Sequence, residues 1–448
     1  MEAKSKINNG KTPYEYSSGP ALFKYLCIAA CGIAVFFIYI LVFLKYPVPG
    51  IKPVNIFFNP DDRHMDFFNL VFKARELDVY TIGQGSFNSP LFFLACFIIN
   101  KIVEGISSGR PPDIYYLLWK TTYCVYITIS LAFFILAFHM LFNRFRVKIF
   151  ERFWFYIVFL LSYPVLFAVD RGNYALMAGG IIALFLVLYL DDRIILSAVI
   201  LGLAAAFKYY YALFFILFLM DKKWKAFFIS AFTAVFIFCC SLALFKGGFI
   251  NNISVLYNGL LHYNLTGANR ITVGEELGHN TSFYMLFDIP YAAANNLFNY
   301  SGEMLGRLNN TVSIAAGWLL MLVLILSVLV KKSHDRVLLL ASGLLLFPFL
   351  SVEYIIPVIF FPMVFWMLNE QEDKVMPWLA GLYIICKRYY SFWDRSDYVS
   401  VTIQGIINPL ILLAIICYII RLRRKLLAET LRKIPGILNS AIKRIKFS

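Results

Sequence analysis

Long apolar runs, separated by short polar turns, follow one another along almost the whole chain. Several of them reach or approach the roughly 20 residues that an α-helix needs to cross a bilayer core. The pattern predicts an all-α polytopic membrane protein, a single domain over residues 1–448 with about twelve transmembrane helices. The runs occupy residues 21–44, 113–142, 153–169, 173–190, 194–207, 209–220, 226–245, 312–330, 337–350, 354–368, 375–390 and 401–420.

The composition excludes an ordinary soluble domain. Hydrophobic residues make up 60% of the 448 residues, charged residues only 15%, and the mean hydropathy is +0.72. The net charge of +15 would suit a nucleic-acid partner, but Lys and Arg mostly separate the apolar runs or follow Arg421. Membrane orientation explains this distribution, so we expect membrane lipids and no nucleic acid as partners. Residues 422–448 read as a basic amphipathic helix on the cytoplasmic leaflet.

Basic residues also predict the direction of the helices. Lys4, Lys6 and Lys11 should keep the N-terminus in the cytoplasm, and alternation then keeps the basic loops 144–152, 222–225, 331–336 and 421–425 inside. One helix over 194–220 would instead place Lys208 at mid-membrane, at a cost of ~2.5–3.5 kcal/mol, and turn every later basic loop outward. We therefore expect two short segments that meet at Lys208, in a plasma (inner) membrane protein with both termini cytoplasmic.

The same topology collects the unusual polar residues on the external face. That face receives the segments 45–111 and 246–311 and the turns at 170–173, Lys208, Glu353 and 387–397. Within the first segment, residues 90–100 are apolar but too few to span a bilayer. We expect them to form an interfacial or re-entrant helix.

Three carboxylates, those of Asp61, Asp62 and Asp66, crowd the start of this external face. Such acids often cap an interfacial helix or solvate a loop, and that interpretation stays open. Asp61 and Asp62 could in principle hold a divalent ion, but Lys208 and Arg171 could supply the positive charge instead. We expect a metal-free site and no cofactor, since the sequence has no P-loop, dinucleotide fingerprint or metal-ligand helix.

Four stretches together resemble the C-type glycosyltransferases, in particular the polyprenol-phosphate-mannose-dependent mannosyltransferases. In chain order, the first stretch resembles that group's first external loop and the second resembles its acidic-Arg-Gly turn. The third resembles its Ala-rich Lys motif, and the fourth resembles its Asn-x-Ser segment. Where the group tends to have a histidine, this chain reads Ser351-Val352-Glu353-Tyr354. The four stretches are Asp66-Phe67 with Lys73-Ala74, Asp78-Val79-Tyr80 and Ser89-Pro90-Leu91-Phe92; Asp170-Arg171-Gly172-Asn173; Ala204-Ala205-Ala206-Phe207-Lys208; and Gly278-His279-Asn280-Thr281-Ser282.

The resemblance implies inverting transfer of a hexose, mannose first, from a polyprenyl-phosphate donor to a lipid-linked or envelope glycan on the extracytoplasmic side. Such transfer needs a carboxylate that takes the proton of the acceptor hydroxyl, and donors beside the departing phosphate. The resemblance implies Asp66 as the base, with Asp62 and Asp61 as alternatives. It implies donor-phosphate contacts from Lys208, Arg171 and His279, and substrate contacts from Asn173, Asn280, Ser282, Glu353 and Tyr354.

Purely structural roles for these residues stay open. Lys208 could extend its ammonium group to the interface, as lysines near helix ends commonly do. Arg171 could pair with Asp170 and cap the turn at Gly172, and His279 could be an ordinary loop residue. Glu353 could pair with Lys208 rather than with substrate.

Two other classes compete with a transferase. A transporter or flippase of lipid-linked sugars would also use external and mid-depth charges, but it predicts an inverted repeat, and the sequence shows none. An O-antigen type polymerase or ligase would need a large external loop rich in Arg and His. The segment 246–311 is long enough but contains few of either.

Overall fold

The computed structural model describes residues 20–45, 64–81, 88–109, 111–270, 282–287, 302–347, 353–386, 391–396 and 399–446. Within these residues the protein is helical apart from one antiparallel hairpin, which confirms the all-α class. The elements are α1 (Pro20–Lys45), α2 (Met65–Lys73), α3 (Pro90–Ser107), α4 (Pro112–Arg144), α5 (Ile149–Leu161), α6 (Tyr163–Arg171), α7 (Ala175–Leu190), α8 (Ile194–Phe207), the 3₁₀ helix η2 (Tyr209–Phe215), α9 (Ile216–Met220), α10 (Trp224–Ala243), α11 (Phe249–Arg270), α13 (Gly302–Leu329), α14 (Ser333–Leu346), the 3₁₀ helix η4 (Glu353–Ile359), α15 (Phe360–Asn369), α16 (Met376–Ile384), β1 (Ser391–Ser396), β2 (Val399–Thr402) and α17 (Ile403–Lys446).

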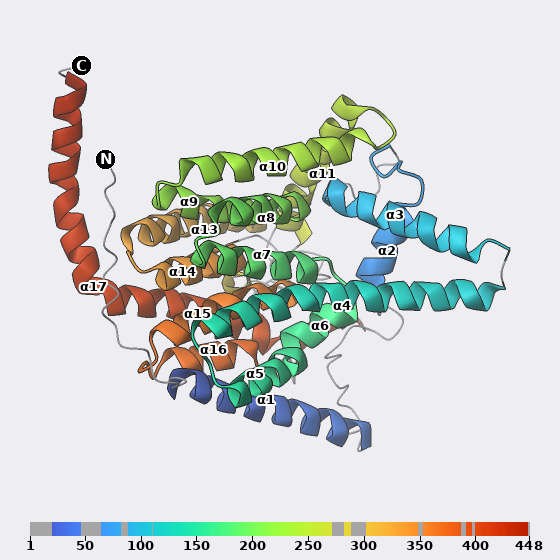
Figure 1. The fold of residues 1–448 in the computed structure, drawn as a ribbon, viewed down its shortest axis with the longest axis horizontal. Helices are drawn as coiled ribbons and strands as arrows, with labels where there is room; N and C mark the ends of the chain where they lie inside the picture. The colour runs from blue at the N-terminus through green and yellow to red at the C-terminus, as the bar shows by residue number, and fades with distance from the viewer. Residues whose placement is uncertain are drawn as a thin grey trace.

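The helices form a bundle in which α7 holds a central place (Figure 1). α10 packs against α8, α8 against α7, and α7 against α4. Nearly every residue of α7 from Ala175 to Tyr189 is buried. This fits its sequence, because a helix that is apolar on all sides is stable only where neighbours cover all sides.

Six described helices are long and apolar enough to cross a membrane, namely α1, α3, α4, α10, α13 and α17. The pair α5 and α6 makes a seventh if it counts as one span, bent by 48° at Ser162 just before Pro164. Four further apolar stretches, α7, α8, η2–α9 and η4–α15, are shorter than a straight span. The multi-pass architecture is confirmed, whereas the number twelve stays a prediction.

Helix α3 differs from its predicted length. We expected an apolar piece over 90–100 that is too short to span, but the helix continues to Ser107 and reaches 18 residues. The polar residue at which the apolar run stops, Asn100, is buried in the structure, and its side-chain amide donates to the carbonyl oxygen of Val71 in α2. Because that contact satisfies Asn100, the helix continues through it.

The loops that we predicted on one side of the membrane lie at one end of the bundle, here called the basic end. Arg144 Nη1 donates to Asp191 Oδ1 at 2.7 Å, which joins the end of α4 to the α7–α8 turn. Arg336 Nη1 of α14 donates to Asp221 Oδ1 after α9 at 2.8 Å. These pairs support the predicted alternation of helix direction.

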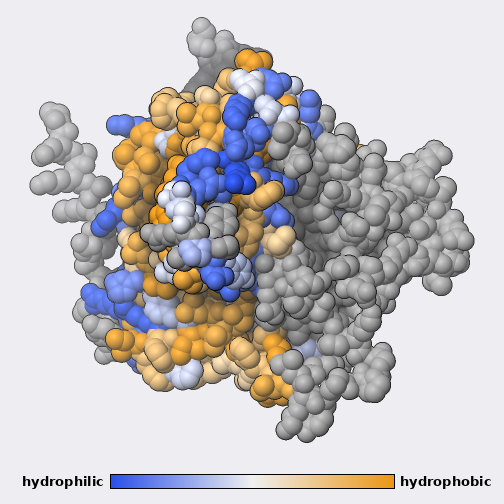
Figure 2. Space-filling view, turned by 90° about the vertical axis from the view of Figure 1, so that its right-hand side faces the viewer, coloured by the Kyte–Doolittle hydropathy of each residue, from blue (hydrophilic) through white to orange (hydrophobic). Residues whose placement is uncertain are grey.

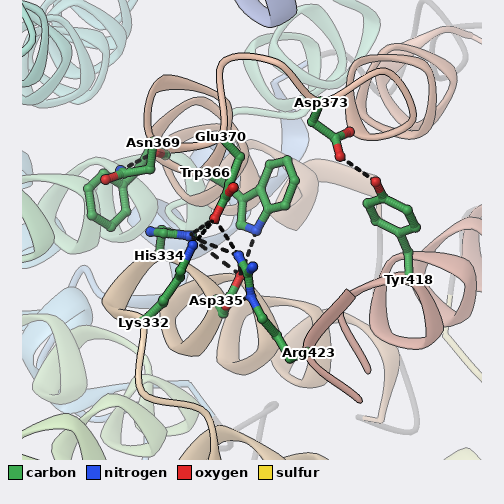
Figure 3. Close-up of polar contacts among 10 residues, drawn as sticks. Lys332, His334, Asp335, Trp366, Asn369, Glu370, Asp373, Tyr418 and Arg423 are labelled. Carbon is green, nitrogen blue, oxygen red and sulfur yellow. Dashed lines mark hydrogen bonds and ion pairs between the residues drawn. The ribbon is translucent and has the colours of Figure 1, made fainter. Parts of the chain in front are cut away.

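A second group of charged residues at the basic end joins α14, α15 and α17 (Figure 3). Asp335 is fully buried, and it accepts hydrogen bonds from Arg423 Nε at 2.7 Å and Trp366 Nε1 at 2.8 Å. Arg423 also pairs with Glu370, which Lys332 Nζ contacts at 2.6 Å. We call these five residues the Arg423 cluster; they join α17 to α14 and α15. The distal part of α17 turns across the end of the bundle (Figure 1).

Candidate active site

The short helix α2 places Asp66 at the opposite end of the bundle from the Arg423 cluster. One face of α2 is buried, and the ring of Phe67 lies 5.5 Å from that of Tyr123 and 5.1 Å from that of Tyr126, both on α4. The sequence predicted Asp66 at the start of the external face, but its side chain is only 17% exposed. The reason is tertiary, because the α6–α7 turn covers this side of α2.

Both carboxylate oxygens of Asp66 have a donor from that turn. Arg171 Nη2 donates to Oδ1, and Asn173 Nδ2 donates to Oδ2 at 2.8 Å. The side chain of Asn173 is itself oriented, because its Oδ1 accepts the backbone N–H of Ala175 at 2.9 Å. The Asp66 carboxylate is therefore fixed in direction, and each of its oxygens keeps a further lone pair for another donor.

Gly172 allows the turn to approach α2 so closely. It ends α6 with φ of +66°, a left-handed conformation that favours glycine. A Cβ atom at this position would lie 2.9 Å from Phe67 Cβ and 2.9 Å from Tyr123 Cε2. The His64 backbone N–H, just before α2, also donates to the Asp170 carbonyl oxygen at 2.7 Å. The Asp-Arg-Gly-Asn stretch thus joins α6, α7 and α2.

Lys208 lies at the break between α8 and η2, as the sequence predicted. Its Nζ is 3.8 Å from the centroid of the Tyr174 ring and 5.7 Å from that of Tyr210. Among the described residues its ammonium group has no hydrogen-bond or ion-pair partner, although Asp66 lies within electrostatic range. An ammonium group that rests on aromatic rings keeps its N–H donors for a ligand.

Sequence reasoning missed the residues that support Lys208. Tyr174 Oη donates to Asn88 Oδ1 at 2.8 Å, and the Tyr174 ring stacks on Phe92 at 4.3 Å. Ser89 Oγ donates to the carbonyl oxygen of Ala206, two residues before Lys208. These contacts bring the starts of α3 and α7 to the end of α8. The sequence did offer a signal for two of them. Asn88 directly precedes the Ser89-Pro90-Leu91-Phe92 stretch, and Tyr174 directly follows the Asp-Arg-Gly-Asn stretch.

His64 was also missed as a site residue. Its ring lies 4.2 Å from the ring of Tyr123, and its buried Nδ1 has no hydrogen-bond partner among the described residues. It stands two residues before Asp66 with φ of 60°, so the backbone turns sharply into α2 there. The signal in the sequence was its place inside the acidic cluster.

The other expected site residues are placed only in part. Ser282 is buried, and the next residue, Phe283, donates its N–H to Leu346 at the end of α14 that faces away from the Arg423 cluster. Glu353 and Tyr354 begin η4, which packs against α6 and α7, but their side chains lie outside the described residues. Asp61, Asp62, His279 and Asn280 also lie outside them.

The expectation of a metal-free site stays a prediction, because Asp61 and Asp62, which could hold an ion, lie outside the described residues. Among the described residues, no three His, Cys, Asp or Glu side chains come together as a metal-binding group. Figure 2 views the molecule from the end that carries α2 and α3, and shows hydrophilic residues in the upper middle of this face with hydrophobic surface to their left.

The comparison with protein families agrees with this geometry. The sequence profile of glycosyltransferase family 87 matches residues 87–352, more than half of the chain. The chain belongs to glycosyltransferase family 87. It is therefore a membrane glycosyltransferase of C type, and the transporter or flippase alternative is not favoured. No curated protein matches the chain.

The family 87 match covers some parts of the site and not others. Arg171, Asn173 and Lys208 lie inside it, as does Asn88. Asp66 lies before its first residue, so the family match does not bear on the catalytic role expected for this carboxylate. What joins Asp66 to the matched region is the structure, through its contacts with Arg171 and Asn173.

Proposed function

We propose that this family 87 enzyme transfers a hexose, with mannose as the first candidate, from a polyprenyl-phosphate donor to a lipid-linked or envelope glycan. The observation that carries the proposal is the pairing of an oriented carboxylate, Asp66, with an ammonium group, Lys208, that has no anionic partner among the described residues. A base and a phosphate-binding cation within electrostatic range of each other suit displacement of a phosphate by a hydroxyl.

In this proposal Asp66 is the base. The acceptor hydroxyl donates to a carboxylate oxygen, and its oxygen attacks C1 of the sugar as the bond from C1 to the phosphate oxygen breaks. Attack from the face opposite the phosphate inverts the configuration at C1. Arg171 and Asn173 then act as positioning residues, because they set the direction of the carboxylate. This assigns Arg171 to Asp66 rather than to the donor phosphate.

Lys208 stabilises the leaving group. When the bond to C1 breaks, negative charge grows on the lipid phosphate, and the N–H donors of Lys208 can form charge-assisted hydrogen bonds to it. Tyr174 and Tyr210 hold the ammonium group by cation–π contact without supplying a competing negative charge.

The position of the site favours a lipid-linked donor. Asp66 and Lys208 lie at the end of the bundle opposite the basic loops, and basic loops tend to remain in the cytoplasm. The site then opens to the periplasm or cell exterior, where soluble nucleotide sugars are not supplied. A polyprenyl carrier delivers an activated sugar on that side.

The test uses purified full-length protein in nanodiscs with radiolabelled polyprenyl-phosphate mannose or glucose, and host membrane lipids as acceptor. Asp66→Asn should lower transfer by about 10²- to 10⁴-fold, because the base is lost while the size of the side chain is kept. Asp113→Asn, at an exposed position in the first turn of α4, is the matched control and should transfer as wild type does.

Transfer that survives in Asp66→Asn would remove the base from the proposal. Absence of transfer from both donors by the wild-type protein, in membranes that supply the acceptor, would argue against polyprenyl-phosphate hexoses as donors. A lipid-flipping assay on the same nanodisc preparation would then examine the alternative.

A further inference from the structure

An apolar groove opens between the end of α8, η2 and α10, on both sides of the break that carries Lys208. It encloses about 250 Å³. Its wall is mostly alanine, with three aromatic rings and one valine: Ala205, Ala206, Ala212, Ala231, Ala234, Tyr209, Phe215, Phe238 and Val235. The small side chains create the groove, because Leu or Phe at the same positions would fill it.

The groove lies on a surface that faces lipid. α10 is long and apolar enough to span a membrane, and most of its length is not covered by other helices. Its outward residues Phe228 and Phe232 are 65% and 69% exposed, and Val235, which lines the groove, is 61% exposed. A hydrocarbon chain in the bilayer can therefore enter the groove sideways without passing through water.

Two polar residues stand next to each other in the chain beside the groove, Tyr209 in its wall and Lys208 just before it. Tyr209 lines the groove, and its buried hydroxyl has no hydrogen-bond partner among the described residues. A buried hydroxyl without a partner is uncommon, so a ligand that supplies an acceptor would stabilise it. Lys208 stands between Ala206 and Tyr209 in the chain, and its ammonium group has no anionic partner among the described residues. The apolar groove, the Tyr209 hydroxyl and the Lys208 ammonium group together favour a ligand with an apolar chain that ends in a phosphate.

We propose that this alanine-lined groove holds the first isoprene units of the donor's polyprenyl chain, with the phosphate beside Lys208 and Tyr209. The inference rests on the proposed function and adds to it the place at which the carrier is recognised. The groove takes only the beginning of a long chain, and the rest remains in the bilayer. The methyl branches of an isoprene chain fit a wall of alanines, whereas an ordinary acyl chain has no branches to place there.

The experiment compares two synthetic mannose donors, one with a full-length polyprenyl chain and one with a two-isoprene chain. The variant Ala234→Phe fills the groove from α10, and Ala231→Leu fills it with a smaller side chain. Ala243→Phe adds the same ring at an exposed position on α10 outside the groove, so it serves as the matched control. Steady-state transfer is measured in nanodiscs of one lipid composition, and the unfolding temperature of each variant is recorded.

We expect Ala234→Phe to raise KM for the full-length donor by about tenfold, which corresponds to the loss of roughly two buried CH₂ groups. Ala231→Leu should raise it less, and Ala243→Phe should leave it unchanged. KM for the acceptor should not change in any variant. A variant that unfolds at the wild-type temperature and shows this pattern supports the groove as the carrier site.

Equal KM values for the full-length donor in Ala234→Phe, Ala231→Leu and Ala243→Phe would overturn the groove assignment, while transfer by the wild type would leave the proposed function in place. A change in KM for the acceptor alone would also overturn it, because the groove would then bind the acceptor lipid. If the wild type used neither donor, the proposed function itself would fail, and the groove assignment with it.

Discussion

At the scale of single residues, the two central charges of the site are held in opposite ways. Asp66 receives a donor on each oxygen, whereas Lys208 rests on the rings of Tyr174 and Tyr210. A base must point in one direction, so donors that orient it are useful. A cation that receives a phosphate must keep its own donors available, and aromatic contact achieves this.

Replacing Lys208 tests this difference. Lys208→Met keeps an unbranched side chain but loses the charge, and we expect kcat/KM for the lipid donor to fall by about 10- to 100-fold, the equivalent of a charge-assisted hydrogen bond of ~1.5–3 kcal/mol. Lys208→Arg should recover part of the activity. The matched control is Lys120→Met, since Lys120 also lies over a tyrosine ring, at 4.4 Å, but at an exposed position of α4. An equal, small effect of both Met variants would contradict the role of Lys208.

At the scale of elements, the α6–α7 turn is what carries two donors to a helix that lies far away in the sequence. Arg171 and Asn173 reach Asp66 only because Gly172 ends α6 in the left-handed conformation and leaves room for α2. The turn, rather than either helix alone, sets the geometry of the carboxylate.

Gly172→Ala should therefore reduce transfer strongly while the protein remains folded. The new Cβ is strained at φ of +66° and would contact Phe67 and Tyr123 at 2.9 Å, so the turn must move away from α2. Gly109→Ala separates backbone strain from steric contact, because Gly109 also has a positive φ, +72°, but, its two chain neighbours aside, no atom of the described residues lies within 4 Å of the position of a Cβ there. We expect transfer to fall in Gly172→Ala and to stay near wild type in Gly109→Ala. Similar activity in both would show that the close approach of the turn to α2 is not required.

At the scale of the whole molecule, the bundle separates two tasks between its ends. The site end holds Asp66 and Lys208, and the basic end holds the Arg423 cluster, which joins α14, α15 and α17. Burial opposes the charge of Glu370, but hydrogen bonds from Lys332 and Arg423 outweigh it and lower the pKa of Glu370 from 4.5 to about 2. The ionised form of Glu370 thus stabilises the folded protein above pH 4.5, and this contribution disappears as the pH falls towards 2.

We expect the unfolding temperature of the wild type in detergent to decrease as the pH is lowered from 4.5 towards 2. Glu370→Gln should unfold at a lower temperature near neutral pH, because Arg423 and Lys332 lose their partner, and should depend less on pH over the acidic range. Glu372→Gln changes an exposed neighbour and should follow the wild-type profile. Parallel profiles for wild type and Glu370→Gln would show that Glu370 does not link pH to folding.

The sequence by itself determined the class of the protein and much of its helix pattern. Apolar length and the placement of Lys and Arg predicted a multi-pass helical protein, and the break at Lys208 appears where those rules placed it. These features depend on local composition, because a bilayer selects apolar helices and keeps basic loops on one side. The family resemblance also selected Asp66, Arg171, Asn173 and Lys208 as residues of interest, although not their contacts.

Only the tertiary structure decided which of these side chains meet. Arg171 reaches Asp66 across 105 positions of the chain, and Arg423 reaches Asp335 across 88. Such pairs depend on how helices rotate and pack, which apolar periodicity does not specify. The same holds for the continuation of α3 through Asn100 and for the groove beside α10, whose alanines read in the sequence as ordinary helix residues. Their function depends on the space that neighbouring helices leave open.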